Sequence, residues 1–285
     1  MTGRDPRRIN ADLHSHSVVS DGMLAPAALV ARAAAGGVEL FALTDHDEVG
    51  GLAEAADAAA RCAIGFVPGV EISVSWGAET VHVLGLNIDP ENPVLLQGLA
   101  ATRSGRDARA RQIARQLDAV GITDAYEGAL GYAGNPAMIS RAHFARHIVA
   151  IGRSASVSDV FGRYLSPGRP GFVPHRWAEL GDAVHWIRGA GGTAVIAHPG
   201  RYALDALGMD ALIDAFVAAG GAGIEVISGA HARDEAARYA SLARRHGLLA
   251  SRGSDFHSPN EGHVELGALA QLPASVEPVW SRWAH

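Results

Sequence analysis

The stretch Ile9-Asn-Ala-Asp-Leu-His14-Ser-His16 is the most informative segment of the chain, because a short strand-like run leads directly into two histidines. We predict a β-strand over residues 9–14. In an extended backbone, residues two apart project from the same face, so His14 and His16 can chelate one ion. An isolated His-x-His pair is a weak signal. Its position at a strand exit, with Asp21 following, favours a metal site.

A matching motif lies near the other end of the chain. Asp255-Phe256-His257 repeats the spacing with a carboxylate and follows an apolar run at residues 248–253. Between these two motifs lie further candidate ligands, most of them at the ends of apolar runs: Asp21, His46, Glu71, His82 and His198.

Seven segments are expected to form strands, and helical patterns separate most of them. The strands are residues 9–14, 38–44, 64–72, 80–88, 193–198, 223–228 and 248–253, and the helices between them are 26–35, 50–62, 182–190, 209–219 and 232–246. Alternation of this kind predicts an α/β fold with a parallel sheet. Ligands of such folds bind at the carboxyl ends of the strands. Most candidate ligands fall at these ends, whereas His82 lies near the start of its strand.

Two segments interrupt the alternation. The link between residues 72 and 80 is shorter than the roughly dozen residues of a crossover helix, so this pair is expected to be irregular or antiparallel. Residues 92–177 contain helical patterns at 95–120, 136–150 and 157–165 but no clear strand. We therefore expect a barrel or sheet domain formed by residues 1–91 and 178–285, with residues 92–177 as a helical cap insertion.

The composition excludes several classes of site. All 24 basic residues are arginine, so Schiff-base chemistry, a Walker-type loop and a carbamylated-lysine metal bridge are excluded. The single cysteine, Cys62, rules out an internal disulfide and a thiolate metal site. The net charge of −6 argues against stable binding of double-stranded DNA. No apolar stretch is long enough for a membrane span, and a cytoplasmic location is expected.

Six imidazoles and three carboxylates make up the candidate set: His14, His16, Asp21, His46, Glu71, His82, His198, Asp255 and His257. Mixed nitrogen and oxygen ligands suit Zn²⁺, Mn²⁺ or Fe²⁺ better than Mg²⁺ or Ca²⁺. The set is too large for one ion, so we expect two or three, with Glu71 placed to bridge.

The ordered motifs resemble those of the polymerase and histidinol phosphatase (PHP) superfamily. The motifs are Asp12-Leu-His-Ser-His16, Ser20-Asp-Gly22, Thr44-Asp-His-Asp47, Pro68-Gly-Val-Glu71, Val81-His-Val-Leu-Gly85, Ala197-His-Pro-Gly-Arg201 and Gly253-Ser-Asp-Phe-His257. Within that superfamily, the chain is similar to bacterial phosphoesterases that hydrolyse nucleoside 3′,5′-bisphosphates, some of which also trim RNA from its 5′ end. Segments of the insertion carry this second similarity: Gly134-Asn-Pro136, Ser140-Arg-Ala-His143 and Pro167-Gly-Arg-Pro-Gly171.

The resemblance implies a distorted (β/α)₇ barrel and a division of the ligands among three ions. The first ion is held by His14, His16, Glu71 and Asp255, the second by Glu71, His82 and His198, and the third by Asp21, His46 and His257. Two or three divalent ions are expected, Mn²⁺ first and Zn²⁺ or Fe²⁺ as alternatives.

The expected reaction is hydrolysis of a phosphate monoester by a metal-bound hydroxide, with Asp255 as a candidate assistant in proton transfer. The resemblance implies removal of the 3′-phosphate of nucleoside 3′,5′-bisphosphates and trimming of short RNA. The expected partner is therefore a small nucleotide or a short oligoribonucleotide, and the oligomeric state is left open. Candidate substrate-binding residues are Arg201, Arg141, His143 and His231. The five arginines between Arg103 and Arg115 are interpreted as a solvated helix face, with an RNA path as the alternative.

Three other functions are compatible with parts of this pattern. An amidohydrolase also begins with His-x-His, but often uses the carbamylated lysine that this chain lacks. A histidinol-phosphate phosphatase would share the metal ligands. A non-catalytic nucleotide-sensing module would have the same fold, although the complete ligand set argues against it.

Overall fold

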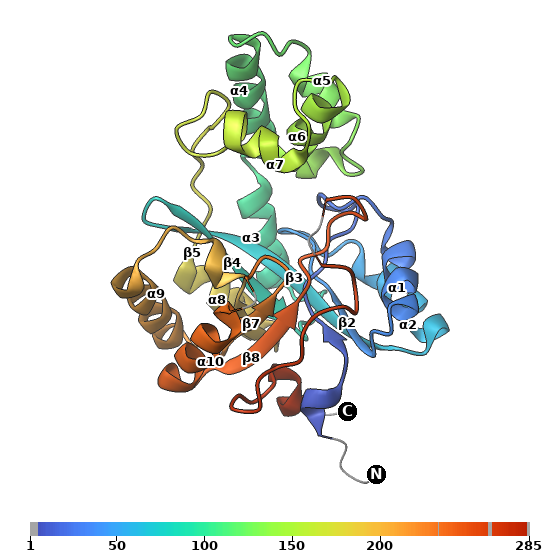
Figure 1. The fold of residues 1–285 in the computed structure, drawn as a ribbon, viewed down its shortest axis with the longest axis vertical. Coiled ribbons are helices and arrows are strands. Elements are labelled where there is room, and N and C mark those ends of the chain that lie inside the picture. The colour runs from blue at the N-terminus through green and yellow to red at the C-terminus, as the bar shows by residue number, and fades with distance from the viewer. Residues whose placement is uncertain (1–4, 233, 262–263, 284–285) are drawn as a thin grey trace.

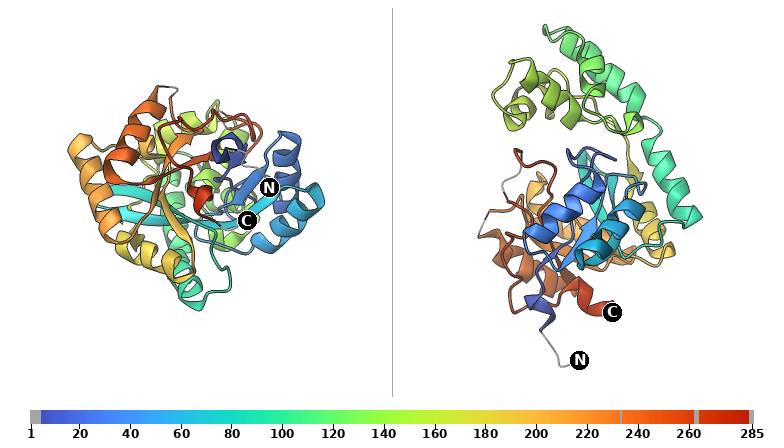
Figure 2. Two further views of the ribbon diagram at one scale, coloured as in Figure 1. Left: turned by 90° about the horizontal axis from the view of Figure 1, so that it is seen from below. Right: turned by 90° about the vertical axis from the view of Figure 1, so that its right-hand side faces the viewer.

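The computed structural model describes residues 5–232, 234–261 and 264–283 and contains one mixed sheet that curves into a nearly closed barrel (Figures 1 and 2). Its main strands follow the order β1-β2-β3-β4-β6-β7-β8, while the short β5 pairs with β3. The strands are β1 (Ala11–Asp12), β2 (Leu40–Leu43), β3 (Gly65–Trp76), β4 (Glu79–Leu86), β5 (Ala178–Glu179), β6 (Thr193–Ile196), β7 (Gly223–Ser228) and β8 (Leu249–Gly253). The α/β barrel expected from the sequence is confirmed, with β5 as an unforeseen addition.

Helices cover the outside of the barrel because their apolar faces and the buried strands share one core. They are α1 (Pro26–Ala35), α2 (Leu52–Cys62), α3 (Pro93–Arg103), α8 (Leu180–Gly189), α9 (Ala206–Ala218) and α10 (Glu235–His246). The α1 pattern was predicted with the observed bounds. Within the described residues, the structure has no helix of the length and apolar character needed to cross a membrane.

The barrel closes where its first and last strands meet. The Leu13 N–H donates to the Arg252 carbonyl at 3.0 Å, and the Asp255 N–H donates to the His14 carbonyl at 2.9 Å. Ser15 and Phe256 form an isolated parallel bridge just beyond these bonds. The two motifs that lie farthest apart in the sequence are therefore neighbours.

The short link between β3 and β4 is an antiparallel hairpin, as its length predicted. The strand β3 continues to Trp76 and turns at Gly77, whose φ of 58° suits glycine. Ser73 near the end of β3 lies opposite His82 near the start of β4. Because β4 runs in the reverse direction, its beginning lies at the end of the barrel where the parallel strands finish. His82 consequently joins the other candidate ligands there.

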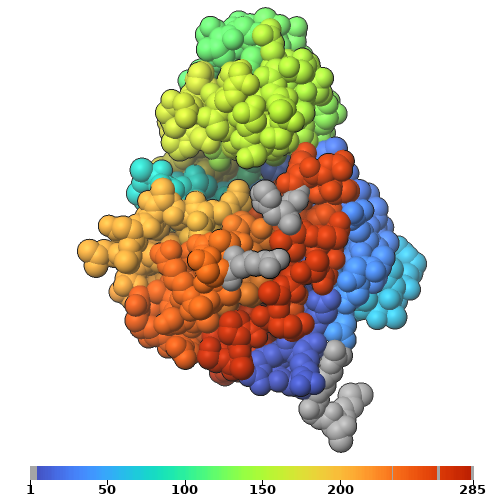
Figure 3. All heavy atoms as spheres, in the orientation of Figure 1, coloured from blue at the N-terminus to red at the C-terminus, as the bar shows by residue number. Residues whose placement is uncertain are grey.

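A second hydrophobic core lies above the barrel in a cap lobe, which we define as residues 106–173 (Figures 1 and 3). It contains α4 (Arg106–Asp118), α5 (Ala125–Leu130), α6 (Arg141–Ala150), α7 (Val157–Val160) and a π-helical turn (Phe161–Leu165). Phe144 and Ile148 are buried in this lobe, whereas Leu95 and Leu99 of α3 belong to the barrel core.

Two helices expected in the insertion are shorter in the structure than predicted. The expected helix over 95–120 is interrupted at Ser104 and Gly105, where a Cβ on Gly105 would lie 2.4 Å from the His175 ring. The expected helix over 136–150 begins only at Arg141, because Ser140 caps α6 after a short 3₁₀ turn. The sequence of α5 shows too little apolar periodicity for a helix to be predicted there.

Candidate metal centre

All nine candidate ligands converge at one end of the barrel. Glu71 is fully buried at the centre, with one carboxylate oxygen 2.9 Å from His82 Nδ1 and 3.0 Å from His198 Nε2. Its second oxygen lies 2.8 Å from His46 Nδ1 and 3.3 Å from His16 Nε2. A single carboxylate thus touches histidines from four segments, which is the arrangement that a bridging ligand requires.

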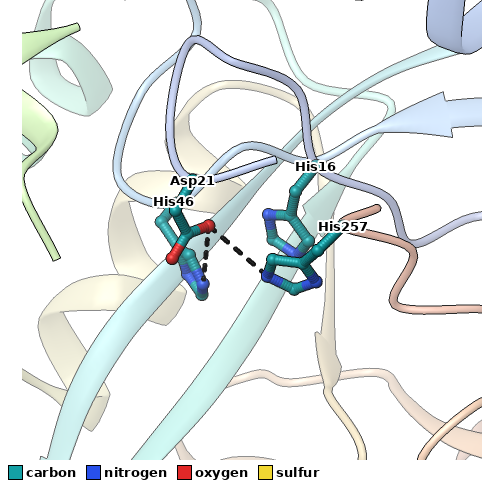
Figure 4. Close-up of side chains that lie close together, drawn as sticks. All are labelled: His16, Asp21, His46 and His257. Carbon is teal, nitrogen blue, oxygen red and sulfur yellow. Dashed lines mark ion pairs between the residues drawn. The ribbon is translucent and has the colours of Figure 1, made fainter. Parts of the chain in front are cut away.

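The ligating atoms fall into four overlapping groups within 4.8 Å. These groups are His16 with Asp21, His46 and His257; His14 with Glu71 and His198; His14 with His16 and Asp255; and His46 with Glu71 and His82. Figure 4 shows the first group, in which Asp21 faces His46 and His257. The groups differ from the division implied by the family resemblance in two ways. His16 joins the Asp21 group, and Glu71 groups with His198 and with His82 separately instead of with both together. They are suited to hold divalent metal ions.

Several buried polar atoms at this centre lack a hydrogen bond. They are His14 Nε2, both ring nitrogens of His16, Asp21 Oδ1, His46 Nδ1, Glu71 Oε2 and His198 Nδ1. Burial of a polar atom without a hydrogen bond is costly, so such a concentration of these atoms calls for a ligand. Imidazole nitrogens and carboxylate oxygens that face a common space fit divalent cations.

Burial and neighbouring charges set the protonation of the centre. Burial lowers the pKa of His16 to about 3, assisted by His257 and His46, and lowers that of His198 to about 3. These imidazoles are therefore neutral at pH 7, the form that binds metal. Burial alone would raise the pKa of Glu71, but the charges of His82, His46 and His14 outweigh it and hold the pKa well below its ordinary value.

Strained backbone places two of the ligands. His198 has a φ of 23° two residues after the end of β6, and Asp255 has a φ of 55° two residues after the end of β8. Non-glycine residues seldom adopt such angles, and the cost is tolerated where the surroundings fix the conformation. The His198 N–H donates to Glu225 Oε2 at 2.5 Å, which is one such constraint.

Glu225 of β7 is a site residue that the sequence reading missed. Its carboxylate is fully buried, with Oε1 3.1 Å from His14 Nδ1. It therefore orients one ligand through the ring and a second, His198, through the backbone. In the sequence, Glu225 is marked only as a single carboxylate inside the apolar strand Gly223–Ser228. No motif spacing connects it to the other candidate ligands.

A cavity of about 580 Å³ opens over the ligands, between the barrel and the cap lobe. Its lining combines Asp21, His46, Glu71, His82 and Asp255 with cationic and aromatic side chains. The cationic and aromatic residues are Arg106, Arg109, Arg141, Arg146, Arg201, Phe161 and Trp177.

The structure distributes the four candidate substrate-binding residues between two environments. Arg201 and Arg141 line the cavity, and Arg201 Nη1 lies 2.7 Å from Asp255 Oδ2. His143 is buried in the capping box of α6, and His231 stacks on Tyr239 while accepting from the Gly200 N–H. Neither histidine belongs to the described cavity lining.

The interpretation of the Arg103–Arg115 segment as a solvated face is wrong for two of its five arginines. Arg106 and Arg109 are buried and line the cavity, with their guanidinium carbons 4.8 and 5.4 Å from the Trp177 ring centroid. Arg111 on the same helix is exposed, as expected. The spacing of the arginines does not reveal which face of α4 is buried, because the side chain that packs against the buried face, Trp177, comes from a distant segment.

Comparisons with known proteins agree with this geometry. The PHP domain family model matches residues 12–107. A 3′,5′-nucleoside bisphosphate phosphatase of Chromobacterium violaceum is 55% identical, over 95% of each chain. A 5′-3′ exoribonuclease of Salmonella typhimurium is 43% identical, over 95% of this chain and 93% of its own. The solved structure of an amidohydrolase from Chromobacterium violaceum, with bound sulfate and no metal, has a TM-score of 0.93 at 54% identity and 95% coverage of both chains.

Proposed function

Since this chain belongs to the PHP domain family, we propose that it hydrolyses the 3′-phosphate of nucleoside 3′,5′-bisphosphates and trims short RNA from its 5′ end. The relatives are named as a bisphosphate phosphatase and as exoribonucleases. The supporting observation is the combination of a metal-ligand cluster and unpaired arginines within one cavity. Such a cavity can hold one phosphate at the cluster and a second phosphate beside the arginines.

The arginines of the cavity favour a substrate that carries a second phosphate group. In the part of the chain that the structure describes, neither Arg109 nor Arg141 forms an ion pair. Burial beside Arg141 and Arg106 lowers the pKa of Arg109 to about 9. A phosphate is the natural partner for such clustered guanidinium groups, since it accepts several charge-assisted hydrogen bonds.

We propose that the nine ligands hold two or three divalent ions and that Mn²⁺ is the working metal. Bound ions would lower the pKa of the attacking water and offset charge on the phosphoryl group. Arg201, held against Asp255, would bind phosphate oxygens at the edge of the cluster. The charges of His14 and His257 outweigh the effect of burial and hold the pKa of Asp255 well below its ordinary value, so its carboxylate is ionised and suited to bind an ion. The expected cytoplasmic location stays a prediction.

The bisphosphate assignment can be tested with Arg141→Gln and Arg109→Gln in Mn²⁺-supplemented phosphate-release assays. Each variant should reduce kcat/KM on adenosine 3′,5′-bisphosphate by about 10- to 100-fold, the loss expected for a charge-assisted hydrogen bond of about 1.5–3 kcal/mol. Activity on adenosine 3′-monophosphate should change little. The control Arg111→Gln removes an exposed arginine from the same helix as Arg109 and should leave both activities intact.

Two results would contradict the proposal. Equal reductions of kcat/KM on the bisphosphate and the monophosphate would show that these arginines do not bind the second phosphate. A higher kcat/KM on histidinol phosphate than on any nucleotide would favour the histidinol-phosphate phosphatase alternative, and absence of any phosphate release would favour a sensing module.

A further inference from the structure

Contacts between the cap lobe and the barrel converge on one part of the metal centre. Ser140 Oγ of the cap lobe donates to Asp21 Oδ2 at 3.0 Å. Arg106 pairs with Asp47, the residue after His46. Arg146 donates to both carboxylate oxygens of Glu261 at 2.8 and 2.7 Å.

Each of these contacts reaches a segment that carries a member of the His16–Asp21–His46–His257 group. Asp21 is itself a member, Asp47 adjoins His46, and Glu261 lies in the segment after His257. By contrast, no hydrogen bond or ion pair from the described cap lobe reaches His14, Glu71, His198 or Asp255. Among the described residues, Asp21 is the one candidate ligand that the lobe contacts by a hydrogen bond or ion pair, and it belongs to this group alone.

The hydrogen bond from Ser140 makes the two carboxylate oxygens of Asp21 inequivalent. Its hydroxyl accepts from the Ala142 N–H at 3.2 Å, so its proton is directed to Asp21 Oδ2. Asp21 Oδ1 has no hydrogen bond and faces His257 Nε2 at 3.4 Å and His46 Nε2 at 3.8 Å (Figure 4). The contact leaves one oxygen free for an ion and fixes the carboxylate plane.

Asp47 forms a second rigid connection. It is fully buried with a φ of 46°, and its carboxylate accepts from the Ser73 N–H at 2.8 Å and pairs with Arg106. The carbonyl of the same residue accepts from Arg103 Nη1 at 2.5 Å. The backbone that presents His46 is therefore fastened to the helices leading into the cap lobe.

We propose that Ser140, Arg106 and Arg146 are positioning residues for an ion held by His16, Asp21, His46 and His257, and that this ion and the docked cap lobe stabilise each other. The inference rests on the proposed metal-dependent function. Residues that orient metal ligands typically change affinity by about 10- to 100-fold when removed. Linkage is reciprocal, so an ion that binds more tightly to the docked form also tightens docking.

The test measures metal binding rather than turnover. Metal-free full-length protein is titrated with Mn²⁺ by calorimetry, and the retained ions are counted by elemental analysis. Ser140→Ala should weaken one class of ion by about 10- to 100-fold and leave the remaining class unchanged. Ser140→Thr keeps the hydroxyl and should restore binding.

Matched controls separate positioning from loss of helix stability. Ser156 also caps a cap-lobe helix, accepting from the Asp159 N–H, but within the described residues it makes no hydrogen bond to the barrel. Ser156→Ala should therefore leave all Mn²⁺ affinities unchanged. In the same way, Arg106→Gln should weaken the affected ion, whereas Arg111→Gln should not.

Hydrogen exchange provides the second readout. Mn²⁺ should slow exchange in α4 and α6 of the wild-type protein, and Ser140→Ala should reduce that slowing. Equal weakening of every ion, an identical effect of Ser156→Ala, or cap-lobe exchange that ignores Mn²⁺ would overturn the inference. If the wild-type protein binds no Mn²⁺ at all, the proposed function fails as well, so the two failures are distinguishable.

Discussion

Glu225 shows how a side chain outside the ligand set controls the geometry of the metal centre. Its two carboxylate oxygens accept from different ligand residues, the His14 ring and the His198 backbone. A carboxylate at His14 Nδ1 favours the tautomer whose Nε2 is free, and Nε2 faces Glu71 and Asp255. The residue thus fixes both the direction of the His14 ring and the nitrogen that faces the metal centre.

Replacing Glu225 with Gln is expected to lower Mn²⁺ affinity by about 10- to 100-fold. The amide offers only one acceptor oxygen, so its NH₂ group must face either the His14 ring or the His198 N–H. Calorimetric titration of the metal-free variant measures the change. Glu235→Gln, at a half-buried carboxylate at the start of α10 that is outside the ligand set, is the control. Unchanged affinity in Glu225→Gln would exclude this orienting role.

Single residues were predicted from the sequence where a motif spacing marked them. The structure brings together all nine candidate ligands at the same mouth. Most of them lie near a strand end, whereas Glu71 lies within β3 and Asp21 in the loop after β1. Glu225 and Arg106 were not foreseen as site residues. Their roles depend on contacts with His14 and Asp47, which are 211 and 59 residues away in the sequence.

At the scale of secondary-structure elements, the N-terminus of α6 combines a cap with a buried titratable group. His143 Nδ1 accepts from the Ser140 N–H at 3.0 Å, and Ser140 caps the helix in return. Burial lowers the pKa of His143 to about 4. In the unfolded chain a histidine has a pKa of about 6.5.

The difference between these two values predicts a loss of stability in acid. Below about pH 6.5 the unfolded chain binds a proton that folded His143 does not bind until about pH 4. Folding stability therefore falls across this window, by at most about 3 kcal/mol. His143→Asn keeps an acceptor for the Ser140 N–H but cannot titrate. The urea-derived stability of the wild type should decline relative to this variant from pH 7 to pH 4, whereas a constant difference would contradict the assignment.

The elements themselves were predictable to different degrees. Helix α1 was predicted with its observed bounds, because proline at its start and two glycines after its end mark it clearly. The break between α3 and α4 was not, because Ser104-Gly105 interrupts the helix only where His175 packs against it. The hairpin of β3 and β4 followed from the short link, and it explains the position of His82.

At the scale of the whole molecule, the sequence determines the barrel more fully than the cap lobe. Strand periodicity and strand-end ligands predict both the α/β class and the position of the mouth. Docking of the lobe depends on pairs such as Arg146–Glu261, which join segments with no local pattern in common. For the same reason, the cavity between lobe and barrel could not be outlined before the tertiary structure was known.

The barrel seam and the metal centre occupy the same place. His14 and His16 follow β1, while Asp255 and His257 follow β8, and the backbones of these segments are joined by the His16 N–H to Phe256 carbonyl bond at 2.9 Å. An ion held by His14, His16 and Asp255 would cross-link the two edges of the sheet. Metal removal should therefore weaken closure of the barrel before it weakens the interior of the sheet.

We expect Mn²⁺ to slow amide exchange at the seam more than at β2, which pairs with strands on both sides. At an ion concentration about 100-fold above Kd, the free energy of opening the seam should rise by about 2.7 kcal/mol. Amide exchange at the seam should then be roughly 100-fold slower. Peptides covering residues 13–16 and 253–257 report the seam, and a peptide covering β2 is the internal control. His16→Ala should abolish most of the difference. Equal slowing in all three peptides would mean that the seam opens only with the whole barrel, contrary to a cross-linking role for the metal.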